Sequence, residues 1–263
     1  YEIRLSLVGS EMCIETAATR AAINAASQLA TGESPTPATA PADATTPPRL
    51  PTILVAHGNA GCLPDHDEFC AFLADHGFNV LLFDYRGYGR SDLPTRGLNR
   101  TDLVADARAA FDYLLTRPDV DPDRIGLLGY SLGGNIGLGF VAIEPRVRAV
   151  VTLATFSRWK EVASDHAGSL GRFLIPEGLD AVDSVARLEA RPYLIVHGDD
   201  DDIVPFRHAA LLEAAARDAG VHVTRLNVVG GDHLDLTKGT DIQAAIARFF
   251  AESMPPVDAS EAP

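Results

Sequence analysis

Residues 124–134 read Arg-Ile-Gly-Leu-Leu-Gly-Tyr-Ser-Leu-Gly-Gly, an apolar run that stops at a serine enclosed by glycines. The run Arg124–Gly129 is nearly continuous in apolar residues, which is typical of a strand buried on both faces of a sheet. The stretch that follows, 132–143, is helix-like. The sequence therefore predicts a strand, a tight turn and a helix in direct succession, with Ser131 at the turn.

The same alternation continues on both sides of this stretch. Further apolar runs lie at 52–57, 79–84, 148–154, 192–197 and 222–229, and helix-like segments lie at 65–76, 101–116, 206–219 and 239–252. Strands that alternate with helices predict a parallel sheet with right-handed crossovers. The predicted fold class is thus α/β, with a mostly parallel central sheet flanked by helices. Ligands of such sheets bind at the carboxyl ends of the strands.

The chain divides into four parts by composition. Residues 1–30 form the N-terminal part of the domain or an extension; 1–8 alternate like a half-buried strand, and the Ala-rich 11–30 predict a helix or, in their first part, a second strand. Residues 31–51 are rich in Pro, Ala and Thr and predict a linker or long loop. Residues 52–254 form the predicted catalytic domain, and 255–263 a disordered tail.

Composition limits the partners. The 263 residues carry a net charge of −14, which argues against nucleic acid or an anionic membrane as the main partner. No run of about 18 apolar residues occurs, so we expect no membrane span. The three cysteines lack metal-site spacing, which favours reduced thiols in a cytoplasmic location. Because the chain starts at Tyr1, an upstream leader or anchor stays open, as does the oligomeric state.

The turn at residues 129–133 is suited to a nucleophile. Gly129 and Gly133 remove the side chains that would collide beside a strained turn, and the turn lifts the Ser131 hydroxyl above the sheet. The helix that follows favours negative charge at its N-terminus. The alternative is a turn of small residues that only packs a strand on a helix.

A serine hydroxyl needs a neighbouring base, and the chain offers one. His233 follows the run 222–229, and Asp201 follows the run 192–197. We expect His233 to take the proton of Ser131, and Asp201 to orient the imidazole. The four aspartates 199–202 also fit an acidic turn or a weak divalent-cation site. His57 and His197 are rival bases, each ending a strand and preceding glycine, but both fit packing positions better.

Acyl transfer also needs donors for an oxyanion. The amide of Leu132, directly after the serine, is the first candidate. The second is the amide of Asn59, in the loop after the run 52–57. Each such donor is typically worth about 3 kcal/mol in the transition state. Neither glycine-rich nucleotide-binding pattern is present, so we expect no nucleotide site.

These motifs, in this order, resemble the α/β-hydrolase superfamily, and within it BEM46-like and dienelactone-hydrolase-like serine hydrolases. The resemblance rests on 57–61, 83–92, the serine turn, 197–205 and 231–233. It implies an α/β-hydrolase fold and cleavage of carboxylic esters through an acyl-enzyme, with a small acyl compound and water as partners and with neither metal nor cofactor. The family pattern assigns the acid to Asp201, with Asp202 as the fallback. Dienelactone hydrolases carry cysteine where this chain has Ser131.

Residues 155–191 lie where related folds insert a lid. The insert is short, which predicts a minimal cap and short-chain or otherwise small acyl substrates. Tyr130, Phe156 and Trp159 are the candidate pocket residues, with ordinary core packing as the alternative. No basic cluster indicates a charged substrate. A thioesterase, peptidase or acyltransferase would use the same residues, and a non-catalytic interaction module is the reading from another class.

Overall fold

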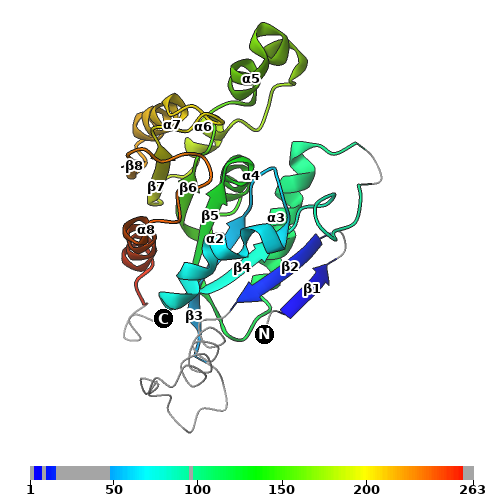
Figure 1. The fold of residues 1–263 in the computed structure, drawn as a ribbon. Coiled ribbons are helices and arrows are strands. Elements are labelled where there is room, and N and C mark those ends of the chain that lie inside the picture. The colour runs from blue at the N-terminus through cyan, green and yellow to red at the C-terminus, as the bar shows by residue number, and fades with distance from the viewer. Residues whose placement is uncertain (1–2, 8–9, 16–47, 95–96, 257–263) are drawn as a thin grey trace, which may run out of the picture.

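The computed structural model describes residues 3–7, 10–15, 48–94 and 97–256, which contribute eight strands to one sheet (Figure 1). The sheet order is β1-β2-β4-β3-β5-β6-β7-β8. Strands β3 to β8 run parallel to one another. Strand β1 pairs antiparallel with β2, and β2 pairs antiparallel with β4. The strands are β1 (Ile3–Leu7), β2 (Ser10–Glu15), β3 (Leu50–Ala56), β4 (Asn79–Phe83), β5 (Val120–Tyr130), β6 (Val147–Leu153), β7 (Tyr193–Gly198) and β8 (Val223–Val228). The predicted mostly parallel α/β sheet is confirmed.

Helices cover both faces of this sheet. They are α2 (Leu63–Asp75), α3 (Arg100–Leu114), α4 (Leu132–Val141), α5 (Trp159–Leu174), α6 (Ala181–Val185), α7 (Arg207–Asp218) and α8 (Thr240–Ser253). One core contains residues of α3, α4, α6 and α7, and the other contains residues of α2 and α8. Helix α5 projects beyond these layers, and Gly171 is its one buried residue (Figure 1).

Strand β5 shows why its sequence is apolar without interruption. Successive side chains of a strand point to opposite faces of the sheet. Leu127 belongs to the core under α3 and α4, whereas Leu128 belongs to the core under α2 and α8. Both side chains are fully buried. A polar residue at either position would lose its water without gaining a partner.

The N-terminal region resolves one open alternative. Strand β2 begins at Ser10, so the first part of 11–30 continues the sheet instead of forming a helix. Strand β3 begins at Leu50, two residues before the predicted domain boundary. The rest of the predicted extension and most of the predicted linker fall in 16–47, outside the described residues, as does the tail from 257. Among the described helices, none has the length and apolarity that crossing a membrane requires.

Candidate active site

Ser131 occupies a strained position between β5 and α4. Its φ of 52° and ψ of −113° lie in a region that residues other than glycine rarely adopt. Two backbone hydrogen bonds fix the turn: the Ser131 amide donates to the Leu153 carbonyl at 2.8 Å, and the Ser131 carbonyl accepts from the Gly134 amide at 3.1 Å. The predicted strand, turn and helix thus meet at this serine.

The two glycines that flank the serine permit a close backbone approach. A Cβ on Gly133 would lie 2.0 Å from the carbonyl oxygen of Ala56, at the end of β3. A Cβ on Gly129 would lie 2.6 Å from the Cα of Gly134. Because both obstacles are backbone atoms, no rotamer change can relieve them. Helix α4 therefore starts directly above the sheet only because these positions carry no side chain.

Ser131, His233 and Asp201 lie in one hydrogen-bonded line. The Nε2 atom of His233 is 3.2 Å from Ser131 Oγ, and Nδ1 is 2.8 Å from Asp201 Oδ2. A carboxylate can only accept, so Nδ1 carries the proton and Nε2 keeps a lone pair toward the serine. All three residues are buried. They come from the ends of β5, β7 and β8, as expected for loops at the carboxyl edge of a parallel sheet.

Asp201 is held as a carboxylate. Its Oδ1 accepts from the amides of Ile203 at 3.0 Å and Val204 at 2.7 Å. Burial opposes ionisation, but hydrogen bonds from His197, His233 and the Val204 amide outweigh it and lower the pKa of Asp201 well below its usual value. The negative charge thus stays where it would stabilise an imidazolium on His233.

The rival residues do not bond to the serine. The Nε2 atom of His197 donates to the Val204 carbonyl at 2.8 Å and lies 3.4 Å from Asp201 Oδ2, so His197 supports the acid loop. The ring of His57 is fully buried, lies 3.3 Å from Asp84 and stacks on His66. Asp202 is exposed. The hydrogen bond of Ser131 Oγ is to His233, not to either rival histidine.

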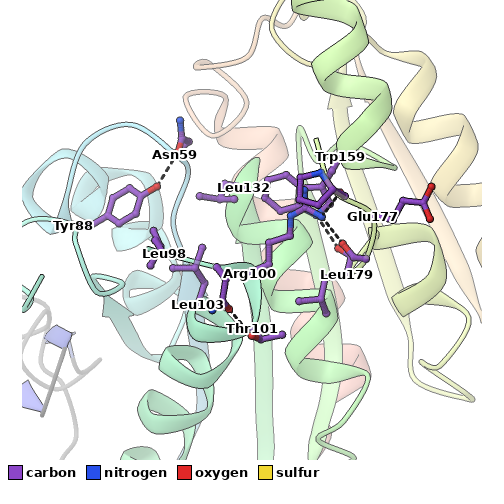
Figure 2. A pocket seen from close by; sticks show the side chains of 13 residues that line it. Asn59, Tyr88, Leu98, Arg100, Thr101, Leu103, Leu132, Trp159, Glu177 and Leu179 are labelled. Atoms are coloured by element: carbon purple, nitrogen blue, oxygen red, sulfur yellow. Dashed lines mark hydrogen bonds between the residues drawn. The ribbon is translucent and has the colours of Figure 1, made fainter. Parts of the chain in front are cut away.

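A cavity of about 550 Å³ adjoins the turn (Figure 2). Both candidate oxyanion residues, Asn59 and Leu132, line it, and so does Trp159. Ser131 and His233 are not among its lining residues, so the cavity meets the serine turn through Leu132 and the loop of Asn59. A volume of this size suits a small-molecule ligand.

Two other candidate pocket residues do not line this cavity. The ring of Tyr130 lies 5.2 Å from that of His233, and its hydroxyl donates to the His233 carbonyl at 3.0 Å. Phe156 is buried, packs edge-on against Trp159 with ring centres 4.8 Å apart, and accepts from Asn135 through its carbonyl. Tyr130 therefore supports the histidine loop, and Phe156 supports Trp159.

A second serine–histidine–aspartate arrangement, not predicted from the sequence, lies between α5 and α7. Ser157 Oγ lies 2.8 Å from Nδ1 of His208, and Nε2 of His208 lies 2.9 Å from Asp165. The first two residues are fully buried, so this arrangement ties α5 to α7 and faces no substrate. No sequence signal marks it, because Ser157 and His208 are 51 positions apart and lack glycine-rich turns. Within the described ranges no group of three or more metal-ligating side chains occurs.

The chain matches one family model and several proteins of similar sequence. A model of the prolyl oligopeptidase family matches residues 66–255. The chain is 37% identical over 204 residues to the uncharacterised protein Rv2307c of Mycobacterium tuberculosis, covering 77% of this chain and 70% of that protein. It is 32% identical over 199 residues to the uncharacterised protein YfhR of Salmonella typhi, covering 72% and 66%. The chain thus spans slightly less than two thirds of the length of YfhR.

Three more distant matches were also found. Protein bem46 of Schizosaccharomyces pombe is 28% identical over 171 residues, covering 63% of this chain and 56% of that protein. The structure of Est1E from Butyrivibrio proteoclasticus with ferulic acid superposes with a TM-score of 0.70 at 16% identity, covering 97% and 100%. Pyrococcus horikoshii acylaminoacyl peptidase gives 0.70 at 16%, covering 98% and 42%. The superpositions show a shared fold, and the matches together confirm the predicted resemblance to BEM46-like α/β-hydrolases.

Proposed function

Because the chain belongs to the prolyl oligopeptidase family, we propose that it is a serine hydrolase that cleaves small carboxylic esters with Ser131 as nucleophile. One observation above all supports the proposal: the hydrogen-bonded line from Ser131 through His233 to Asp201. The small cavity beside Leu132 supports a small substrate. A small acyl compound and water are the proposed partners, in the cytoplasmic location predicted from the cysteines.

The reaction proceeds through an acyl-enzyme. His233 Nε2 takes the proton of Ser131 Oγ as Oγ bonds to the ester carbonyl carbon. The carbonyl oxygen becomes an oxyanion, for which the amides of Asn59 and Leu132 are the proposed donors. The ester C–O bond then breaks, and the imidazolium returns its proton to the departing alkoxide. Water, activated by the same imidazole, hydrolyses the acyl-Ser131 ester and restores the hydroxyl.

A peptidase is the second candidate, favoured by the family whose model matches. The same residues would attack an amide, and the difference lies in the leaving group. Turnover of short p-nitrophenyl esters beside the corresponding anilides, under identical conditions, separates the two. We expect the esters to be cleaved and the anilides to remain intact at least about 10²-fold longer.

The nucleophile is tested with a fluorophosphonate probe and a matched serine. We expect Ser131→Ala to abolish labelling and to lower kcat by at least about 10⁴-fold. Ser157→Ala is the control, because Ser157 also bonds to a histidine but is fully buried. The Ser157→Ala protein should still be labelled by the probe. Undiminished labelling or turnover in a folded Ser131→Ala protein would refute the proposal.

A further inference from the structure

The cavity contains one arginine in an unusual setting. Arg100, the first residue of α3, is half-buried and places its guanidinium 4.1 Å from the ring centre of Trp159 (Figure 2). Its Nη1 donates to the carbonyls of Pro176 at 3.0 Å and Gly178 at 2.7 Å. These contacts fix the guanidinium plane against the cavity wall, as cation–π stacking favours.

This arginine lacks an acidic partner. Among the described residues no carboxylate oxygen lies within 4 Å of its guanidinium. Two carboxylates of this region are engaged elsewhere. Glu177, on the same cavity wall, bonds to Lys160. Asp180, whose charge acts on Arg100 without contacting it, bonds to Arg158 and the Trp159 amide. The chain has 36 acidic and 22 basic residues, yet none of the described carboxylates contacts this half-buried cation.

A comparison with Arg191 separates this arginine from a purely structural one. Arg191 also bonds only to carbonyls, but all three of its guanidinium nitrogens donate, to four carbonyls in total. Arg100 uses Nη1 alone, so Nε and Nη2 retain their donors. Burial lowers the pKa of Arg100 against the opposing effect of the Asp180 charge, which means that the Arg100 charge is partly desolvated. A guanidinium with free donors in a partly dry cavity binds a carboxylate strongly.

We propose that Arg100 binds a carboxylate of the substrate and so selects esters that carry a negative charge at the end of a short apolar group. The apolar part of the cavity matches such a group, since Leu98, Leu103 and Leu179 line it beside Trp159. This inference rests on the proposed function, because the cavity adjoins the serine turn. The proposed carboxylate site has a single arginine, so no basic cluster marks it in the sequence. Arg100 contacts residues 176 and 178 only in the folded chain.

Binding is measured without turnover, in the Ser131→Ala protein. Trp159 is the single tryptophan of the chain and stacks on Arg100, so its fluorescence reports a ligand there directly. Monomethyl adipate places the carboxylate on the acyl side, with methyl hexanoate as the neutral match. The acetate ester of 4-hydroxybutyrate places it on the leaving-group side, with butyl acetate as the match. Calorimetry measures the same affinities independently of the tryptophan.

We expect a saturable signal, with at least one charged ligand binding at least tenfold more tightly than its neutral match. Arg100→Gln should weaken that ligand at least tenfold, and Arg100→Lys should weaken it less. The control is Arg148→Gln, which removes one positive charge from an exposed position at the start of β6. It should leave the affinities within twofold.

Equal affinity for the charged and neutral member of both pairs would overturn the inference, and this result requires no Arg100 variant. An unchanged affinity in folded Arg100→Gln would overturn it as well. The proposed function fails separately, by continued probe labelling in Ser131→Ala. A protein that binds the carboxylate but cleaves no ester would therefore retain this site and lose only the hydrolase proposal.

Discussion

The hydroxyl of Tyr88 donates to the side-chain Oδ1 of Asn59 at 2.8 Å, so the loop after β4 holds the loop after β3. The Tyr88 loop is itself anchored, because Arg86 binds Asp106 of α3 through its amide and its guanidinium. Burial raises the pKa of Tyr88, which keeps the hydroxyl protonated as a donor. The proposed oxyanion donor on Asn59 is therefore positioned from a neighbouring loop.

Tyr88→Phe tests this support. We expect kcat for a short ester to fall by about 3- to 10-fold, since one hydrogen bond contributes about 1 kcal/mol. The unfolding temperature should change little. Tyr113 is a half-buried tyrosine of α3, so Tyr113→Phe is the matched control and should keep kcat within twofold. If Tyr88→Phe has wild-type kcat, the Asn59 loop holds its position without this hydrogen bond.

The acid is identified by two neighbouring substitutions. Asp201→Asn keeps an acceptor for the Ile203 and Val204 amides but removes the charge that faces His233. We expect it to lower kcat by about 10⁴-fold, as loss of the triad carboxylate does in serine proteases. Asp202→Asn removes an exposed carboxylate and should leave kcat within twofold. Steady-state kinetics with the reverse ranking would move the acid to Asp202.

Helix α4 offers a matched pair of glycines. Gly133→Ala would push a methyl group into the Ala56 carbonyl, and we expect a loss of stability of about 1–3 kcal/mol. Gly139→Ala meets only side-chain methyls of Leu179 and Val104, at 3.3 Å, and should change stability by less than about 1 kcal/mol. Thermal unfolding by circular dichroism ranks the two. Equal unfolding temperatures would mean that the backbone contact at Gly133 relaxes freely.

The uninterrupted apolar runs made the strands of the sheet predictable. Leu127 and Leu128 are both apolar because each faces a different helical layer, and that continuous pattern is visible in one sequence. The motifs that carry Ser131, Asp201 and His233 were also local, since each follows a strand. Parallel strands bring their carboxyl ends to one edge, so three separate motifs predict one site.

Contacts between distant segments could not be predicted in this way. Arg100 reaches the carbonyl of Pro176 across 76 positions, and neither residue stands in a recognisable motif. Tyr130 illustrates a second limit. It belongs to the core under α2 and α8, whereas Leu132 belongs to the core under α3 and α4. Tyr130 therefore contacts the histidine loop and does not line the cavity, although it is adjacent to the nucleophile in the sequence.

The attachment of α5 predicts a pH dependence of stability. His208 is fully buried, and burial lowers its pKa, against the opposing effect of Asp165. Arg207 lowers the pKa further, and Glu161 raises it slightly. His208 therefore binds a proton more readily in the unfolded chain than in the folded one. Its contribution to the free energy of unfolding is fully present above the unfolded pKa of about 6.5 and is lost as the pH falls toward the lower folded pKa.

We expect the free energy of unfolding, from urea titrations, to decrease between pH 7.5 and 5.5, by at most about 1.4 kcal/mol per pH unit for this histidine. His66, whose pKa burial also lowers, adds to the same slope. His208→Gln should reduce both the stability at pH 7.5 and the slope, whereas His166→Gln, at an exposed position of α5, should keep the slope. A slope that survives His208→Gln intact would show that acid loosens another part of the fold first.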